Sequence, residues 1–433
     1  MTTTLCPARD NAPSSAVFDL FLRLLSSNWT WGQLTLVSPD GSRRRLIGRH
    51  PGHSAVLNIV SYRFAARVLK SGDIGFAEGY MAGEWRSPEL AVLLETLVNN
   101  YDHIRRLFDG NGLMRAINRL AHRRNRNSRR GSRRNIHAHY DLGNAFYSAW
   151  LDPSMTYSSA RFERADQSLE DAQRGKYASL ARLMDLQRGH SVLEIGCGWG
   201  GFAEFAAREI GATVTGITIS REQYDFARRR LFEAGLADKA DIRLVDYRDI
   251  SGRFDRVASI EMFEAVGRQY WPAYFRKVHD ALKPGGRAGL QIITIQDKLV
   301  DEYEARTDFI QKYVFPGGSL PSETQLASVV SGAGLMVEAV ERFGLDYAET
   351  LKDWSDRFIA AWPQILRQSA GFDERFRRLW LFYLAYCEAG FRSRRTDVVQ
   401  LALCQSSLRE LSRRPFGAVE QYPPKISDFQ HAR

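Results

Sequence analysis

The chain has 433 residues, of which 44% are hydrophobic, and its 60 lysines and arginines outnumber its 50 acidic residues. This length and composition leave room for about two or three domains with buried cores, which excludes a disordered protein, a collagen and a small disulfide scaffold. The formal net charge of +10 favours a polyanionic partner, either nucleic acid or an anionic membrane surface.

The four cysteines are irregularly spaced, and none forms a CxxC pair. We therefore predict a reducing, cytoplasmic compartment, with no disulfide framework and no metal site. The apolar stretch from Ala16 to Leu25 is interrupted by Asp19 and Arg23, which is not the pattern of a secretory signal. No stretch reaches the roughly 18–20 apolar residues that span a bilayer, so we expect any membrane contact to be peripheral.

The first expected domain is a small α+β unit over residues 1–112. Helical spacing occurs at 18–25, 60–69 and 88–98. Between the first two of these, short strands at 32–37 and 44–47 flank a turn sequence, Ser38-Pro39-Asp40-Gly41.

An arginine-rich linker is expected next, at 113–135. It contains no acidic residue, and without its nine arginines the chain would carry a net charge of only +1. It is either a solvated linker or an anion-docking patch, and we favour the patch because so many like charges repel one another. RNA binding is disfavoured because no aromatic residue is interleaved with the basic ones. The arginines are Arg115, Arg119, Arg123, Arg124, Arg126, Arg129, Arg130, Arg133 and Arg134.

Strands and helices alternate in the third region, a catalytic domain expected over 136–433. Apolar strands are predicted at 191–195, 213–219, 242–245, 256–260 and 288–295, with helices at 202–210, 222–234 and 273–282. This alternation predicts an α/β fold with a parallel sheet covered on both faces.

Helices dominate after residue 296. They are expected at 298–314, 323–332, 350–366 and 374–390, with a strand at 336–342. The helix at 374–390 carries an aromatic stripe at helical spacing. Such a stripe is usually core, and here it is also a candidate wall for an apolar chain.

The segment Val192–Gly201 carries the clearest chemical signal. It places glycines at 196, 198, 200 and 201 where a strand feeds a helix, so that a ligand can lie against the backbone. No basic residue is present to grip a pyrophosphate, and the Glu194 carboxylate suits the ammonium group of S-adenosylmethionine. We therefore predict an S-adenosylmethionine loop rather than a nicotinamide loop.

The next two strand ends fit the same ligand. Thr218 stands where many nucleotide-binding sheets have an acid for the ribose hydroxyls, and Gln223 follows one turn into the helix. Asp246-Tyr247-Arg248-Asp249 closes the third strand, where we expect the adenine edge.

Over nearly its whole length the sequence resembles the cyclopropane-fatty-acyl-phospholipid synthase family of S-adenosylmethionine-dependent methyltransferases. The resemblance implies a class I methyltransferase sheet, Rossmann-like and with helical insertions, preceded by a smaller α+β domain. The segments that carry it are 73–81, 139–144, 155–158, the glycine loop, 218–220, 262–267, 315–322 and 387–392.

The resemblance also implies the site residues. Cofactor contacts are expected from Tyr157, Ser158, Glu194, Ile195, Gly196, Cys197, Gly198, Trp199, Gly200, Gly201, Thr218, Ile219, Ser220, Gln223, Tyr247 and Arg248. A bicarbonate ion acts as the base in the family, and the matching positions are Ser159, Glu264, Gln291, Ile293 and Tyr347. Cys387 matches a cysteine long treated as an active-site residue of the family. Because it is a lone cysteine on an aromatic helix, we favour the alternative that it is a buried core residue.

Three positions depart from the family pattern. Ser159 replaces a cysteine, while Ala265 and Gln291 each replace a histidine. We therefore expect an altered ion pocket, with Glu264, Tyr347 and any bound ion as the candidate base.

The expected reaction is attack of an acyl-chain double bond on the cofactor's methyl group, followed by proton loss. Loss of a proton from the new methyl closes a cyclopropane ring, and loss elsewhere leaves a methyl-branched or methylene chain, which we favour. We expect a phospholipid membrane partner at the inner, anionic face, a homodimer and no nucleic acid. Two alternatives stay open: a small-amine methyltransferase of the same superfamily, and a lipid- or RNA-binding protein without activity.

Overall fold

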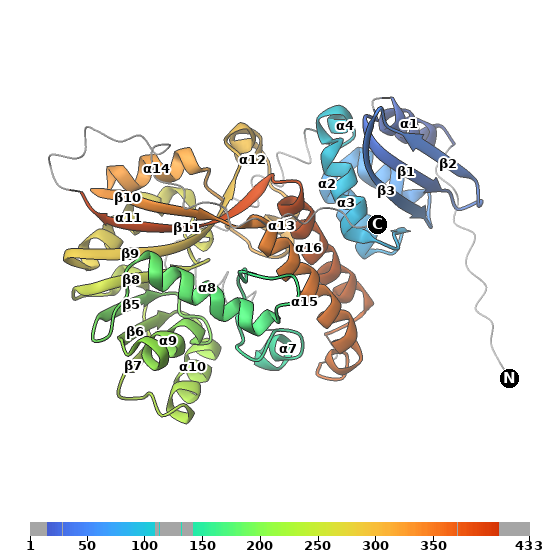
Figure 1. Cartoon of the computed structure of the whole chain (residues 1–433). Coiled ribbons are helices and arrows are strands. Elements are labelled where there is room, and N and C mark those ends of the chain that lie inside the picture. The colour runs from blue at the N-terminus through green and yellow to red at the C-terminus, as the bar shows by residue number, and fades with distance from the viewer. Residues whose placement is uncertain are drawn as a thin grey trace. The chain divides into compact units, whose positions relative to one another are not determined.

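The structure is a computed structural model of the chain, which describes residues 15–27, 29–108, 112, 131, 142–369 and 371–406 (Figure 1). Its contacts divide the chain into two compact units. The first unit comprises residues 1–121, 306–309 and 371–393, and the second comprises the remainder. The nine arginines of the expected linker and the motif residues 139–141 lie outside the described residues, so the linker boundaries stay predictions.

The first unit contains a four-stranded sheet with the strand order β2-β1-β3-β4. The predicted hairpin is confirmed, because β1 and β2 are antiparallel and are joined through a turn closed by the Gly41 N–H on the Ser38 carbonyl. β3 was not predicted, since its first half contains His, Pro, Gly and Ser and is exposed. The strands are β1 (Trp31–Val37), β2 (Arg43–Ile47), β3 (His50–Ile59) and β4 (Trp85–Arg86).

The helices of this unit include one from the far end of the chain. They are α1 (Ser15–Ser26), α2 (Arg63–Met81), α3 (Leu90–Asn99), α4 (Tyr101–Phe108) and α16 (Glu374–Arg392). α16 packs against α2 and α3. Its Phe382 lies in ring contact with Phe76 of α2 and with Trp85, at centroid distances of 6.4 Å. The aromatic stripe therefore forms core, and its contacts group it with the first unit rather than with the sheet of the second.

The second unit contains a seven-stranded sheet with the order β10-β11-β9-β8-β5-β6-β7. The five strands from β9 to β7 are parallel, as predicted, while β10 and β11 are antiparallel to their neighbours. The chain reverses its direction of travel across the sheet at β5, and open α/β sheets bind ligands at such a point. The strands are β5 (Ser191–Ile195), β6 (Thr213–Thr218), β7 (Ala240–Leu244), β8 (Phe254–Ile260), β9 (Leu282–Ile295), β10 (Leu335–Arg342) and β11 (Thr396–Gln405).

Among the remaining described helices, α7 and α8 were not predicted, while those after β5 follow the strands in the predicted order. The single helix expected at 298–314 is broken into a short turn, α12 and α13, so that prediction was wrong. The helices are α7 (Asn144–Ser148), α8 (Leu169–Leu183), α9 (Gly201–Phe205), α10 (Arg221–Glu233), α11 (Trp271–Ala281), α12 (Val300–Ala305), α13 (Phe309–Tyr313), α14 (Glu323–Gly332) and α15 (Gly344–Ile365). Single turns of tighter or wider helix occur at Ala206–Ile210, Tyr247–Asp249, Phe263–Ala265, Arg268–Tyr270 and Asp297–Leu299.

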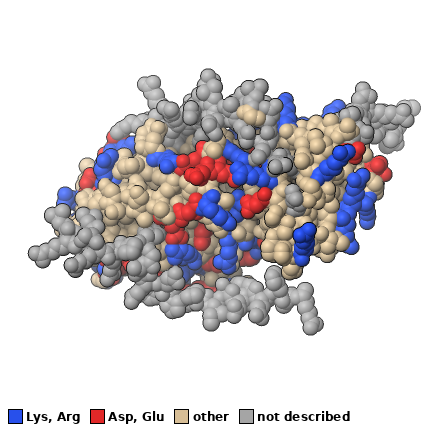
Figure 2. All heavy atoms as spheres, turned by 90° about the horizontal axis from the view of Figure 1, so that it is seen from above, with Lys and Arg blue, Asp and Glu red and all other residues tan. Residues whose placement is uncertain are grey.

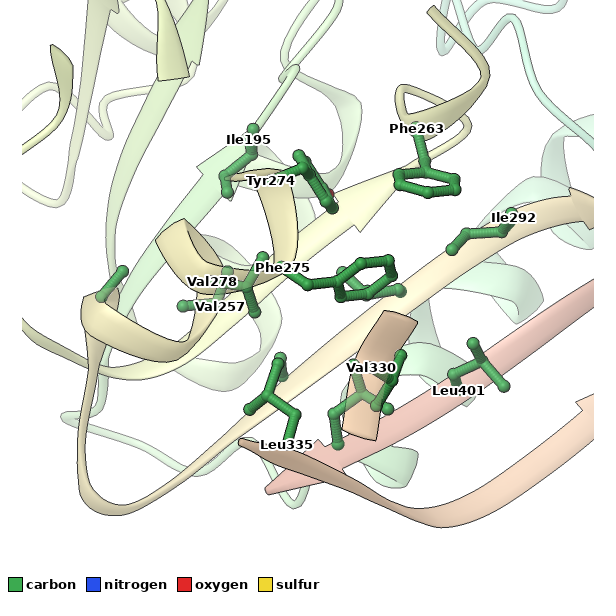
Figure 3. Packing of buried hydrophobic residues seen from close by; sticks show 14 of the residues in the cluster. Ile195, Val257, Phe263, Tyr274, Phe275, Val278, Ile292, Val330, Leu335 and Leu401 are labelled. Carbon is green, nitrogen blue, oxygen red and sulfur yellow. The ribbon is translucent and has the colours of Figure 1, made fainter. Parts of the chain in front are cut away.

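Apolar clusters cover both faces of this sheet. On one face, residues of α11 and α14 pack against the strands, as Figure 3 shows for Tyr274, Phe275 and Val330. On the other face, α8, α9 and α10 form a second cluster with β5 and β6. Phe263 joins the first cluster, with ring centroids 5.1–5.3 Å from those of Trp271, Tyr274 and Phe275. This packing anchors the turn that follows β8.

None of the described helices is long and apolar enough to cross a bilayer. On the face drawn in Figure 2, acidic and basic side chains both occur, and they lie next to one another in the middle of the view.

Candidate active site

The cofactor loop, residues 196–200, leaves the carboxyl end of β5 and leads into α9. The N–H groups of Gly196 and Cys197 both donate to the Ile217 carbonyl at the end of β6, each at 2.9 Å. Gly196, Gly198 and Gly200 have φ of +80°, +52° and +86°, a region that side chains disfavour. A Cβ added at Gly198 would meet no atom within 4 Å, so this side of the loop is open to a ligand.

Glu194 is the last acidic residue before the loop. Its side chain is buried, and its Oε2 has no hydrogen-bond partner. Burial raises the pKa of Glu194 to about 8, against the pull of Arg230 and Lys176. A buried carboxyl oxygen without a hydrogen-bond partner, beside an open glycine loop, fits a ligand that carries an ammonium group, as S-adenosylmethionine does.

The end of β6 forms a small hydrogen-bonded network. The Thr218 hydroxyl donates to Gln223 Oε1 at 2.9 Å and accepts the Ser220 N–H at 3.1 Å. Ser220 caps α10 by accepting the Gln223 N–H. These three polar residues and Ile219 therefore stand at the strand end, as predicted, with their orientations fixed by one another.

The turn after β7 holds Tyr247 and Arg248. The Arg248 guanidinium makes a two-pronged ion pair with Asp246, at 2.8 and 2.7 Å, and lies 5.4 Å from the Tyr247 ring centroid. Arg248 thus stiffens the turn, while the Tyr247 ring remains half-buried at the strand end.

Aromatic rings gather around Tyr157. Its ring centroid lies 5.2 Å from that of Trp354, 5.7 Å from that of Trp150 and 5.4 Å from that of Tyr147. Tyr147 in turn contacts Trp199 of the cofactor loop, whose Nε1 donates to Asn144. Aromatic faces of this kind stabilise a nearby cation.

A cluster that we call the carboxylate pocket lies at the ends of β8 and β9, next to β5 in the sheet. Its centre is Glu261, which the sequence analysis did not single out. Glu261 Oε1 accepts the Ser159 N–H at 2.8 Å and the Gln291 Nε2–H at 2.7 Å, and Oε2 accepts the Tyr347 hydroxyl at 2.6 Å. The pocket comprises Ser158, Ser159, Lys176, Glu261, Glu264, Gln291, Ile293 and Tyr347.

Two of the predicted pocket residues act differently from expectation. The Ser159 hydroxyl donates to the Ala160 carbonyl, so Ser159 faces the pocket with its backbone N–H. Gln291 is buried, and its Oε1 accepts from Gln400 Nε2 on the adjacent strand β11 at 3.0 Å. This contact turns the Gln291 amide nitrogen towards Glu261.

Glu264 lies three residues beyond Glu261 on the same turn. Its Oε1 accepts the Ile293 N–H at 2.6 Å, and its Oε2 is buried without a partner. Burial and the neighbouring Glu261 carboxylate raise the pKa of Glu264 to about 8. Burial also raises the pKa of Glu261, while Lys176, Tyr347 and the backbone of Ser159 oppose the shift.

Lys176 on α8 is the second residue that the sequence analysis missed. It is fully buried, and its Nζ donates to the Ser158 hydroxyl at 2.6 Å. Burial lowers the pKa of Lys176 to about 7, and the carboxylates of Glu261, Asp152 and Glu194 partly offset that effect. Lys176 therefore interacts electrostatically with both the carboxylate pocket and the acid beside the cofactor loop.

Cys387 is the one predicted site residue that belongs to the first unit. It lies on α16, and burial raises the pKa of its thiol. A thiol held in its neutral form is a poor nucleophile, which favours the structural interpretation of this cysteine.

Comparisons with known proteins agree with this geometry. A sequence model of the family described as mycolic acid cyclopropane synthetase matches residues 127–401. The tuberculostearic acid methyltransferase UfaA1 of Mycobacterium tuberculosis is 41% identical over 360 residues, covering 78% of this chain and 80% of that protein. The cyclopropane-fatty-acyl-phospholipid synthase of Escherichia coli is 39% identical over 346 residues, covering 78% of this chain and 85% of that protein.

A comparison with solved structures shows the same similarity in the fold. The mycolic acid cyclopropane synthase CmaA1, complexed with SAH and CTAB, aligns with a TM-score of 0.58 at 31% identity, covering 63% of this chain and 98% of that chain. The chain therefore belongs to the cyclopropane synthase family, whose S-adenosylmethionine-dependent enzymes modify unsaturated lipid chains.

Proposed function

We propose that the enzyme methylates a double bond in an unsaturated acyl chain of a membrane phospholipid and forms a methyl-branched or methylene product. One observation carries this proposal. The carboxylate pocket lies at the ends of β8 and β9, next to the strand that bears the cofactor loop. A group that accepts a proton thus stands beside the proposed methyl-donor site.

The residues divide the work between them. S-adenosylmethionine supplies an electrophilic methyl group when bound. Glu194 would pair with its ammonium group, and the open side of Gly198 would take its bulk. The Tyr157 and Trp354 rings would stabilise the cation that the alkene becomes, by roughly 0.5–2 kcal/mol each. The carboxylate pocket would then accept the proton that the chain must lose.

The composition of the pocket supports a product without a ring. Ala265 and Gln291 offer no imidazole. The proton is therefore removed by carboxylates, which occupy other positions than the two histidines of the family pattern. The two relatives do not decide the product, because their identities of 41% and 39% are nearly equal while one is named a methyltransferase and the other a cyclopropane synthase.

We further propose peripheral docking on an anionic membrane. The arginine run at 115–134 is the main candidate. On the first unit, β2 adds three exposed arginines, Arg43, Arg44 and Arg45, beside Ile47, which is 65% exposed. Basic residues next to an exposed apolar side chain suit a phospholipid surface. The homodimer also stays a prediction, which light scattering of the purified protein tests.

The experiment is expression in a bacterial host that lacks such enzymes, followed by mass spectrometry of its phospholipid fatty acids. We expect new acyl chains that are one carbon longer and unsaturated or branched. The Gly198→Val variant, expressed to the same level, serves as the control and should form less product. A host whose monounsaturated chains stay unchanged would contradict the proposed function.

A further inference from the structure

The positions matched to the family's bicarbonate site are already engaged by the protein itself. Three donors at these positions, the Ser159 N–H, the Gln291 amide and the Tyr347 hydroxyl, all point to Glu261. A fourth, the Ile293 N–H, points to Glu264. The residues therefore do not fit a free bicarbonate ion.

We propose that the Glu261 carboxylate takes the place of the bicarbonate ion and is itself the base of the reaction. Glu261 is then a catalytic residue, and the enzyme needs no bicarbonate. This inference rests on the proposed function, because the proton that Glu261 accepts is the one released after methyl transfer.

The backbone fixes Glu261 in this place. Its N–H donates to the Gln291 carbonyl at 2.9 Å, while its side chain accepts from the Gln291 amide. Its φ of +48° turns the chain sharply out of β8, a conformation that costs a non-glycine residue energy. Phe263, two residues later, locks the turn into the core. A residue with a strained backbone that hydrogen bonds and packing keep in place, as Gln291 and Phe263 do for Glu261, is typical of a functional site.

The hydrogen bonds leave one position for a proton. A carboxylate offers about four acceptor sites, two on each oxygen. Glu261 Oε1 uses both of its sites, for Ser159 and Gln291, whereas Oε2 uses one, for Tyr347. The second site of Oε2 is thus the acceptor. Glu261 also keeps part of its surface accessible, although Ser159 and Gln291 around it are buried.

The neighbouring carboxylate is less suited to carry the negative charge. Glu264 accepts one N–H, from Ile293, whereas Glu261 accepts three hydrogen bonds and interacts with the Lys176 ammonium. Donors to a carboxylate stabilise its charged form. When two carboxylates share a site, one holds the charge and the other keeps its proton. This division leaves Glu261 ionised and Glu264 neutral.

The π electrons of the alkene form the new bond to the methyl carbon, and the sulfur leaves with the electron pair of its bond to that carbon. For a methyl-branched product, a C–H bond on a chain carbon next to the resulting cation then breaks, and its electron pair forms a carbon–carbon double bond. For a methylene product, a hydride first shifts with its electron pair from the methyl-bearing carbon to the cation, and a C–H bond of the new methyl then breaks to form the double bond. Without that shift, the electron pair of a methyl C–H bond forms a ring bond. The proton goes to Glu261 Oε2 and passes to solvent after product release.

The test on the unaltered enzyme has two readouts, both made in buffer stripped of carbon dioxide. Binding of ¹³C-labelled bicarbonate is followed by NMR, and turnover is measured on vesicles of unsaturated phospholipid with and without added bicarbonate. We expect no binding in the pocket and equal turnover in both buffers. Bicarbonate binding that the Tyr347→Phe change abolishes, or turnover that requires bicarbonate, would overturn the inference.

The Glu261→Gly variant sharpens this test. Glycine accepts the positive φ and leaves the donors of Ser159, Gln291 and Tyr347 free. We expect this variant to bind bicarbonate, to lose turnover by on the order of 10²–10⁴-fold without it, and to regain much of that loss when it is added. A folded variant that binds no bicarbonate would contradict the claim that the side chain occupies the ion's place.

The matched control is Arg394→Gly. Arg394 is exposed, has a φ of +57° and lies outside the carboxylate pocket, so this change relieves the same backbone conformation elsewhere. We expect its turnover and its lack of a bicarbonate response to equal those of the unaltered enzyme. If no phospholipid is methylated although the cofactor binds, the proposed function fails, while the NMR readout still decides whether Glu261 fills the ion site.

Discussion

The cofactor loop and the carboxylate pocket lie at neighbouring strand ends of one sheet, but they are built in different ways. The loop is a single stretch of chain, residues 196–200, and its shape comes from backbone hydrogen bonds and positive φ angles. The pocket is assembled mainly from side chains, with two backbone N–H groups, on the 158–159 segment, α8, the turn after β8, β9 and α15.

This difference separates two tasks. Backbone N–H groups and glycines, which lack side chains, form the ligand-binding surface of the loop. The shape of this surface changes little when a distant residue is replaced. A network of side chains sets which group holds a proton, and a single replacement redistributes its charge. We therefore expect the loop to control cofactor affinity and the pocket to control turnover.

The largest effect should separate the two acids of the pocket. Glu261→Gln should lower turnover by about 10²–10⁴-fold, the usual contribution of a general base. Glu264→Gln should cost less, because Glu264 accepts one hydrogen bond and carries less of the charge. Initial rates on phospholipid vesicles measure both. Equal losses, or a larger loss at Glu264, would contradict the assignment of the base.

Cofactor affinity should respond to the loop instead. Gly198→Val would place side-chain atoms in the open volume beside the loop and should weaken S-adenosylmethionine binding by about 10- to 100-fold, as about 1–3 kcal/mol of overpacking does. Calorimetric titration measures this. Gly235→Val is the control, since Gly235 is exposed, has a φ of +68° and also has open space beside it. The same affinity in both variants would show that the ligand does not lie at Gly198.

Membrane docking should depend on where positive charge is removed. Replacing Arg129, Arg130, Arg133 and Arg134 with Gln should weaken binding to anionic vesicles several-fold, because each basic residue near the surface contributes about 1 kcal/mol before screening by salt. Co-sedimentation at low and high salt measures the change. The control removes four exposed arginines of the second unit, Arg208, Arg221, Arg228 and Arg229. If both variants lose vesicle binding equally, docking depends on net charge alone and not on the position of these arginines.

The last prediction concerns stability and pH. Glu264 has a folded-state pKa of about 8 against an ordinary value of 4.5, so between these values the folded protein binds more protons than the unfolded chain. Its contribution to stability is therefore full below about pH 4.5 and declines as the pH rises through this window, by at most about 1.4 kcal/mol per unit.

Glu264→Gln removes that decline. Relative to the unaltered enzyme, the variant should gain thermal stability as the pH rises from about 5 to about 8. Unfolding midpoints across this range measure the difference, with the exposed Glu170→Gln as the control. A variant whose relative stability falls with pH would show that Glu264 is ionised in the folded protein.

The sequence predicted the features that are continuous along the chain. The strand–loop–helix at 191–205 carries its glycines and its acid within one segment, and the alternation around it predicts the parallel sheet. The strand β11 was missed because a short apolar run after an aromatic helix has no periodicity of its own. Its place between β9 and β10 is set by tertiary packing.

The pocket could be predicted only in part for the same reason. Its matched positions were identified, but Glu261 and Lys176 were not. Glu261 stands one residue beyond β8, where ligand-facing residues gather. Its position after a predicted strand could therefore have identified it as a site residue. No feature of the sequence identifies Lys176 as a site residue, because a lysine in a helix with charged neighbours normally faces solvent. Its burial follows from the packing of α8 against β9 and β11.

The most direct test of the account uses S-adenosylmethionine with a fully deuterated methyl group and vesicles of unsaturated phospholipid. Mass spectrometry of the product acyl chains reports both the transfer and the proton that is lost. We predict labelled chains without a ring, which keep all three deuteriums in a methyl branch or two in a methylene group. Chains without deuterium would contradict the methyl transfer, and two deuteriums in a saturated ring would contradict the proposed product.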